Sequence, residues 1–189
     1  MMAKHYKIIA LMGQAGSGKD RLLKESLKAV PDLNEIISCT TRPPREGEVH
    51  GKNYYFLSNE EFAQKVINFE MLEATSFRDW FYGTSIDALS EDKVNIGVFN
   101  PDGIYALLES PNIEVCVYWV NANPKTRLMR QLQREENPDV NEIIRRYGTD
   151  EKDFSDISFT YTKLDNETYD DIGRAVAQIA QSIDLDKNI

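Results

Sequence analysis

The chain has 189 residues, of which 41% are hydrophobic and 28% charged, so its composition suits one folded domain and argues against a disordered chain, collagen or a coiled coil. Its net charge of −9 argues against a general electrostatic surface for nucleic acid, so any anion site must gather its positive charge locally. The apolar runs fall short of the roughly 20 residues that cross a membrane, and the two cysteines lack a partner spacing, which predicts a reducing, cytoplasmic location.

The first predicted elements are a buried strand over residues 6–12 and a helix over residues 18–29, joined by a glycine-rich loop. The loop has the pattern G-x-x-x-x-G-K, and its residues are Gly13, Gln14, Ala15, Gly16, Ser17, Gly18 and Lys19. Glycines let backbone N–H groups turn toward phosphate oxygens, and the helix adds its positive end. Lys19 can reach the β- and γ-phosphates. The loop therefore predicts a nucleotide site.

Residue 20 departs from this loop pattern, which normally has Ser or Thr there to bind Mg²⁺ through a hydroxyl. Asp20 offers a carboxylate, a stronger oxygen ligand for Mg²⁺, and it also places a negative charge near the triphosphate. Two interpretations stay open: Asp20 holds the metal directly or through water, or the loop has lost magnesium binding. Gly-Lys-Asp loops resemble those of some phage-type deoxynucleotide kinases, which favours the first.

The next segment combines two arginines with two prolines. After a predicted strand at residues 35–39, Arg42 and Arg45 lie three positions apart on a turn that Pro43 and Pro44 keep out of a helix. Two guanidinium groups on a stiff turn form a clamp for a second phosphate. A strand-like stretch at 53–57 and a capping box at Ser58–Glu61, which opens a helix through about residue 67, follow.

The rest of the chain alternates strands with helices, which predicts an α/β fold with a parallel, doubly wound sheet flanked by helices. The predicted strands are 94–99, 113–120 and 157–162, and the predicted helices are 127–134, 141–147 and 168–183. Residues 38–84 break this rhythm and are predicted to form an inserted mixed lobe, and residues 125–148 a helical lid. The predicted core comprises residues 1–37, 85–124 and 149–189.

Three separated blocks resemble the guanylate kinase family in order and spacing. Residues 38–56 match the pattern S-x-T-T-R-x-P-R-x-G-E-x-x-G-x-x-Y-x-F, and the pattern continues at 70–73, at 80–84 and in the arginines of the lid. The resemblance covers most of the chain. It implies ATP-dependent phosphorylation of GMP or dGMP with Mg²⁺, and nucleotides as the partners.

The resemblance also implies roles for individual residues. The acceptor phosphate would be held by Arg42, Arg45, Tyr54 and Tyr82. The guanine edge would be read by Ser38, Glu73 and Thr84. The transferring phosphoryl group would be enclosed by Arg130, Arg134 and Arg146 or its neighbour Arg145.

Each role has a plainer alternative. The clamp arginines and Glu73 could be solvated surface charges, the tyrosines ordinary packing, and Thr84 the cap of a helix. The lid arginines could form a helix face paired with Glu135, Glu136 and Glu142.

Two departures from the family pattern leave other functions open. Where the family has two acids, this chain has Val98 and Asn100; Asn100 keeps a hydrogen-bond acceptor for a base amino group but has lost the charge. A kinase of this architecture for another deoxynucleotide or a sugar phosphate therefore stays an alternative. So does a non-catalytic module that binds a protein partner, although such modules typically have a damaged phosphate loop and this loop is complete.

Overall fold

The computed structural model describes residues 5–45, 47–77, 79–134 and 136–186 and divides into two compact units. The first unit comprises Met1–Ile9 and Asp32–Val115, and the second comprises Ala10–Pro31 and Cys116–Ile189. The predicted lobe at 38–84 lies wholly in the first unit and the predicted lid at 125–148 wholly in the second. The division into core, lobe and lid remains a prediction.

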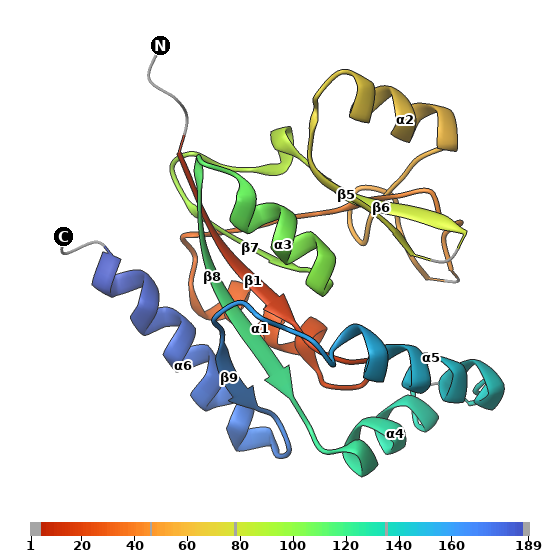
Figure 1. Cartoon of the computed structure of the whole chain (residues 1–189). Coiled ribbons are helices and arrows are strands. Elements are labelled where there is room, and N and C mark those ends of the chain that lie inside the picture. Colours follow the sequence, from red (N-terminus) through yellow and green to blue (C-terminus); the bar gives the residue numbers. More distant parts are fainter. Residues whose placement is uncertain (1–4, 46, 78, 135, 187–189) are drawn as a thin grey trace. The chain divides into compact units, whose positions relative to one another are not determined.

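The fold is α/β with a parallel sheet flanked by helices, as the alternation of elements predicted (Figure 1). The sheet has the order β2-β7-β1-β8-β9. Its strands are β1 (Tyr6–Met12), β2 (Leu33–Glu35), β7 (Val94–Val98), β8 (Ile113–Asn121) and β9 (Thr162–Asp165). In the first unit β2 pairs with β7 in parallel, and in the second β8 pairs with β9 in parallel. Apolar side chains of β1 and β8, such as Ile8, Leu11 and Val120, are buried.

A second sheet lies in the first unit and has the order β4-β3-β6-β5. Its strands are β3 (Cys39–Thr40), β4 (Tyr55–Phe56), β5 (Met71–Phe77) and β6 (Trp80–Ser85). The strands β5 and β6 form an antiparallel hairpin, β6 also pairs with β3, and β3 pairs with β4 in parallel. This mixed sheet carries three of the residues that the sequence assigned to the acceptor nucleotide, Glu73, Tyr82 and Thr84, while Ser38 and Tyr54 directly precede two of its strands.

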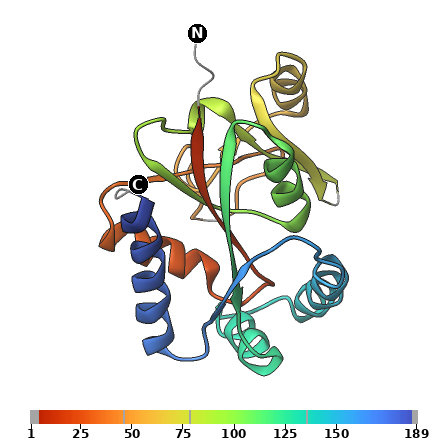
Figure 2. The ribbon, with the colours of Figure 1, turned by 60° about the vertical axis from the view of Figure 1, so that its left-hand side comes forward.

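The helices follow the local signals in the sequence. In the second unit α1 (Lys19–Ala29) and α6 (Tyr169–Asp186) pack side by side, as both ribbon views show (Figures 1 and 2). The same unit contains α4 (Pro124–Leu132) and α5 (Val140–Asp153). The first unit contains α2 (Asn59–Ile67), the 3₁₀ turn η1 (Ile86–Ala88) and α3 (Pro101–Glu109), which packs against β5. The predicted capping box is present at the start of α2. Within the described residues, no helix has the length and apolar character needed to cross a membrane.

Three predicted strands are wrong in their bounds, and the one predicted at 53–57 is shortened to β4 (Tyr55–Phe56). The predicted strand at 35–39 is divided, because β2 ends at Glu35 and the chain then turns into β3 of the other sheet. The segment 35–39 thus contributes its first residue to one sheet and its last residue to the other.

The strand predicted at 157–162 begins only at Thr162, and α5 continues to Asp153, beyond its predicted end at 147. The aromatic side chains of Phe154 and Tyr161 pack on the Trp119 ring instead of forming a ladder, with ring centroids 5.5 and 5.0 Å from it.

Candidate functional site

The glycine-rich loop lies in the second unit, between the end of β1 and the start of α1. Gly16 and Gly18 have φ values of 79° and 93°, in the left-handed region that glycine adopts without strain. A Cβ on Gly16 would meet the carbonyl group of Arg127, and a Cβ on Gly18 would meet the side-chain amide of Asn166. Both glycines are therefore required by the backbone path and by the close approach of neighbouring segments.

Side chains from neighbouring segments donate hydrogen bonds to three carbonyl groups of the loop. The Arg130 guanidinium donates to the carbonyl oxygens of Gly16 and Ser17 at 3.4 and 3.3 Å, and Asn166 Nδ2 donates to the Ser17 carbonyl at 2.6 Å. Gln131 Nε2 donates to the carbonyl oxygen of Ala15 at 3.4 Å. Since the C=O and N–H of a peptide unit point in opposite directions, this arrangement turns loop N–H groups away from α4. N–H groups arranged in this way make an anion-binding concavity.

Lys19 and Asp20 begin α1 directly after the loop. Lys19 is half-buried, and Asp20 is exposed in the first turn, where the positive end of the helix favours a carboxylate. Among the described residues, no group of three or more His, Cys, Asp and Glu side chains could hold a metal ion. A Mg²⁺ site at Asp20 would therefore need nucleotide phosphates to supply other ligands, as is usual for this ion.

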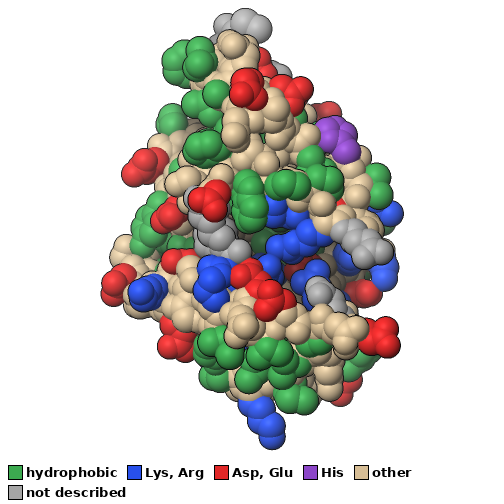
Figure 3. Space-filling view, turned by 90° about the vertical axis from the view of Figure 1, so that its right-hand side faces the viewer, with side chains coloured by type: hydrophobic (Ala, Val, Ile, Leu, Met, Phe, Trp, Pro, Cys, Tyr) green, Lys and Arg blue, Asp and Glu red, His purple; other side chains and the backbone are tan. Residues whose placement is uncertain are grey.

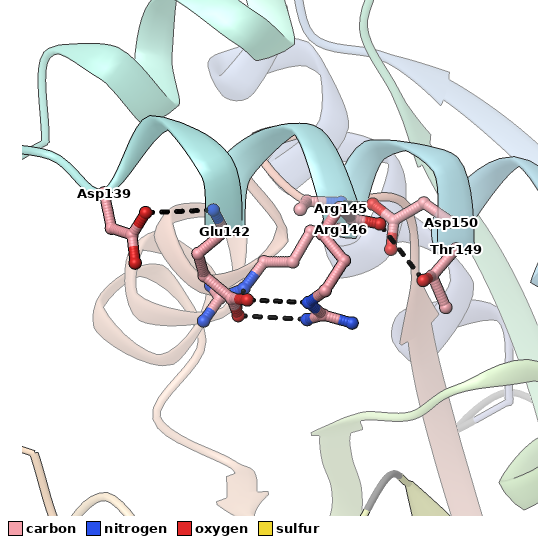
Figure 4. A network of polar contacts seen from close by, with 7 residues as sticks. Asp139, Glu142, Arg145, Arg146, Thr149 and Asp150 are labelled. Atoms are coloured by element: carbon pink, nitrogen blue, oxygen red, sulfur yellow. Dashed lines mark hydrogen bonds and ion pairs between the residues drawn. The ribbon is translucent and has the colours of Figure 1, made fainter.

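The predicted lid arginines are engaged in different ways. Arg130 is bound to the loop, whereas Arg134 is exposed. Glu142 accepts hydrogen bonds from Arg145 Nε at 2.7 Å and from Arg146 Nε at 2.8 Å, which is the helix-face pairing that the sequence left open (Figure 4). The predicted partner Glu135 lies outside the described residues.

Two residues near the loop were missed in the sequence. Arg127 is only 2% exposed; its guanidinium lies 4.7 Å from the centroid of the Tyr147 ring, and its Nη2 donates to the Tyr147 hydroxyl at 3.2 Å. Arg127 precedes Arg130 by three positions, a spacing that could have placed both on one helix face. Asp150 of α5 accepts a hydrogen bond from the N–H of Ala15 across 135 residues, and no local signal points to it.

In the first unit, Arg42 and Arg45 are joined by Glu48. Arg42 is 6% exposed, and its Nη2 donates to Glu48 Oε1 at 2.9 Å; the backbone N–H of Arg45 donates to Glu48 Oε2 at 2.7 Å. Burial raises the pKa of Glu48, but the hydrogen bonds from Arg45 and Arg42 and their positive charges outweigh burial and hold the pKa below its usual value. Glu48 is the glutamate of the family pattern over residues 38–56, and its role in ordering the clamp was missed.

Aromatic rings surround the buried arginine of the clamp. The Arg42 guanidinium lies 5.6 Å from the centroid of the Tyr54 ring and 5.8 Å from that of Phe56. The rings of Tyr54 and Tyr82 contact each other edge-on at 6.1 Å. The mixed sheet therefore places Arg42, Tyr54 and Tyr82 together, with the exposed Arg45 beside them through Glu48.

Glu73 is the buried carboxyl group of the same unit. It lies on β5 opposite Thr84 of β6, and it is 8% exposed. Burial raises the pKa of Glu73 to about 7, and the polar groups of Thr84 counter this only in part. A carboxyl group with a pKa near neutrality, held in a buried position, is a marker of functional sites.

The remaining predicted acceptor residues lie around this carboxyl group or along the same sheet. Asn100 caps α3: its side-chain oxygen accepts from the N–H of Gly103 at 2.8 Å, and its amide donates to the Thr75 hydroxyl at 3.4 Å. A Cβ on Gly103 would lie 3.4 Å from Glu73 Oε2, so the amino end of α3 adjoins Glu73. Ser38 is half-buried just before β3, and its carbonyl accepts from the N–H of Tyr55 at 2.9 Å. The oxygen of Asn100 is thus already engaged by its own helix.

Each unit contributes positive side chains to its predicted site although the net charge of the chain is −9. Arg42 and Arg45 belong to the first unit, and Lys19 and Arg130 belong to the second. Figure 3 shows Lys and Arg side chains on the face in view, with Asp and Glu side chains among them. Positive charge close to the site is what an acidic chain needs in order to bind an anion.

Comparisons with known proteins agree with these features. The family model described as guanylate kinase matches residues 5–183. The guanylate kinase of Rhodopirellula baltica is 30% identical over 182 residues, covering 92% of this chain and 86% of that protein. The guanylate kinase of a Nostoc species is 42% identical over 83 residues, but that match spans only 42% of the relative's length and 44% of this chain.

A solved structure is similar in fold. The crystal structure of guanylate kinase from Anaplasma phagocytophilum has a TM-score of 0.68 and covers 97% of this chain and 87% of that one. Its sequence identity of 18% supports the fold alone.

Proposed function

The chain belongs to the guanylate kinase family, and from this premise we propose that it transfers the γ-phosphoryl group of ATP to GMP or dGMP. The products are ADP and the guanosine or deoxyguanosine diphosphate. Two free cysteines, Cys39 and Cys116, support a cytoplasmic location for this activity.

The observation that carries the proposal is a buried carboxyl group and a buried guanidinium in one compact unit. Arg42 offers a fixed positive charge for a phosphate, and Glu73 offers hydrogen-bond acceptors for a base. Guanine presents N1–H and its exocyclic amino group side by side, and one carboxylate can accept from both. Adenine presents an acceptor at N1, which a carboxylate repels. The pair therefore favours a guanine nucleotide as acceptor.

The reaction asks for positioning and charge neutralisation more than for covalent help. An oxygen of the acceptor phosphate forms a bond to the γ-phosphorus, and the bond from that phosphorus to the bridging oxygen breaks, leaving ADP. The acceptor phosphate is already a nucleophile, so no general base is required. Lys19 at the start of α1 would neutralise charge on the moving group, and we assign Arg130, Arg134 and Arg146 the same task.

Mg²⁺ fits the residues at the start of α1. The Asp20 carboxylate is exposed in the first helical turn, and an ion at this place can complete its ligand set with phosphates and water. When bound, the ion supplies further neutralisation of phosphate charge. The chain's own contribution is the carboxylate of Asp20, which would hold the ion directly or through water.

Replacing Asp20 with alanine should raise the Mg²⁺ concentration needed for half-maximal activity by about tenfold. This is the lower end of the loss in metal affinity expected when a ligand or a group that orients a ligand is removed. Asp20→Ser should retain most of the activity because a hydroxyl also binds Mg²⁺. The measurement is the rate of GMP phosphorylation as Mg²⁺ is titrated. If Asp20→Ala follows the parent curve at limiting Mg²⁺, Asp20 has no part in holding the metal.

The pKa of Glu73 predicts a pH dependence for base binding. Only the ionised carboxylate accepts two hydrogen bonds from guanine, so affinity should rise with pH up to about 7 and then stay level. At pH 6 we expect binding about tenfold weaker than at pH 8, since the ionised fraction falls tenfold per unit below the pKa. Guanosine is the suitable ligand because it has no phosphate that titrates. A Glu73→Gln control should show no such dependence, and a flat parent profile would contradict the assignment.

A coupled assay for ADP, with ATP, Mg²⁺ and each common nucleoside monophosphate in turn, tests the proposed function. We expect GMP and dGMP to be the preferred acceptors. Preference for another nucleotide would favour a related kinase. Failure to phosphorylate any of them, with ATP binding intact, would favour a non-catalytic binding module.

A further inference from the structure

A carboxylate of the chain itself already binds the phosphate loop. Asp150 Oδ2 lies 2.5 Å from the backbone nitrogen of Ala15, which donates its N–H to it. Hydrogen bonds from N–H groups to ionised carboxylates are short and about twice as strong as neutral ones. Ala15 stands in the middle of the glycine-rich loop, whose N–H groups are suited to anions. An internal anion therefore occupies one of the donors in the loop.

The helix α5 holds this carboxylate in place. Ile143, Tyr147 and Asp150 are spaced i, i+4 and i+7 and so lie on one face of α5, and Ile143 is buried. Tyr147 of this face is covered by the guanidinium of Arg127 from α4 and accepts a hydrogen bond from it. Figure 4 shows that Asp150 lies further along the helix from Arg145 and Arg146, which bind Glu142 instead. Asp150 is thus placed on the loop by the packed face of α5, separately from the two arginines that are paired with Glu142.

Arg127 of α4, which contacts Tyr147 on this face, is a buried cation whose hydrogen-bonding groups are only partly satisfied. The Nε and Nη1 groups of Arg127 have no hydrogen-bond partner within the described part of the chain. Buried polar groups normally have partners, and a buried cation without them is costly. The unpartnered atoms of Arg127 therefore add a cost to the packing between α4 and α5, the helix that carries Asp150.

We propose that Asp150 is an internal competitor for nucleotide phosphate at the Ala15 N–H, and that it lowers the affinity of the loop for ATP. A carboxylate and a phosphate oxygen need the same donor and carry like charge, so the phosphate has to displace Asp150 or bind against its repulsion. The identity of the nucleotide rests on the proposed function. The competition itself concerns only the loop and α5, which belong to one unit.

The test compares Asp150→Asn and Asp150→Ala with Glu151→Gln, which changes the charge by the same amount at the next, exposed position. Dissociation constants for inorganic pyrophosphate and for ATP are measured by calorimetry without Mg²⁺. Both Asp150 variants should bind each ligand about tenfold more tightly than the parent. This factor corresponds to the lower end of the free energy of a charge-assisted hydrogen bond, and we expect the lower end because Asp150 is half-exposed. Glu151→Gln should stay within about twofold, as expected for screened surface charge.

A second readout follows the Ala15 amide in a ¹H–¹⁵N correlation spectrum. Its proton should resonate further upfield in ligand-free Asp150→Ala than in the parent, because the bond to the carboxylate is gone. Adding pyrophosphate to the parent should shift the same resonance. Asp150→Asn keeps the shape of the side chain and can still accept the hydrogen bond, so if the alanine variant does not fold it tests the loss of the negative charge in the binding measurement instead.

The outcomes separate this inference from the proposed function. Equal or weaker binding by both Asp150 variants would overturn it and make Asp150 a brace of the loop or a metal ligand. An equal gain in Glu151→Gln would also overturn it, because the effect would then be general charge. A parent that binds ATP yet phosphorylates no nucleoside monophosphate would overturn the proposed function, while the comparison of Asp150 variants would stand.

Discussion

Lys19→Met should lower kcat for GMP phosphorylation by about 100- to 1000-fold, the range observed when one preorganised donor to a transition state is removed. Lys19 is the first residue of α1 and follows directly on the loop whose carbonyl groups are tied to Arg130 and Asn166. Its position is therefore fixed by the loop and the helix together. The substitution removes a side-chain cation that would stabilise the charge on the β- and γ-phosphate oxygens during transfer.

The matched control is Lys24→Met, an exposed lysine of the same helix, which should leave kcat within about twofold of the parent. Steady-state rates with saturating ATP and GMP give kcat, and thermal unfolding checks that both variants fold. A Lys19→Met enzyme whose kcat matches that of the Lys24 control would show that the loop does not take part in transfer.

Glu73→Gln should lower kcat/KM for GMP by about 10- to 150-fold, because a hydrogen bond to a charged group contributes about 1.5–3 kcal/mol. A neutral amide offers one acceptor and one donor, so its NH₂ group would oppose one of the two guanine donors. The same amide matches the edge of adenine, and kcat/KM for AMP should therefore not fall. Asn100 cannot replace the lost charge, because it is neutral and its oxygen caps α3.

The measurement compares GMP with AMP in parallel, and Glu60→Gln on the exposed face of α2 is the control in the same unit. An unchanged GMP-to-AMP ratio in folded Glu73→Gln would remove the main support for a guanine acceptor.

The Glu73→Gln variant should also fold at least as stably as the parent above pH 7. The pKa of Glu73 is raised by folding, so the native state binds more protons and the parent loses stability as pH rises from about 4.5 to about 7.

The elements that are determined by interactions between residues close in sequence were predicted closely. The strand over residues 6–12 agrees in both bounds, and the helix after the glycine loop differs by one residue at its start. The capping box forms as predicted: the Ser58 hydroxyl accepts from the N–H of Glu61 at 3.1 Å, and the Glu61 carboxylate accepts from the N–H of Ser58 at 2.8 Å. These interactions join residues three apart, so the local pattern contains all the information they need.

The sequence by itself determined the presence of the phosphate loop, the alternation of strands and helices, and the stretch with Arg42 and Arg45. Tertiary structure decided the electrostatic state of the site. Glu73 pairs with Thr84 of β6 and is buried there, and this burial raises its pKa. The hydrogen bond between Ala15 and Asp150 joins residues 135 positions apart. Desolvation and long-range hydrogen bonds depend on which segments pack together, and no pattern within one segment contains that information.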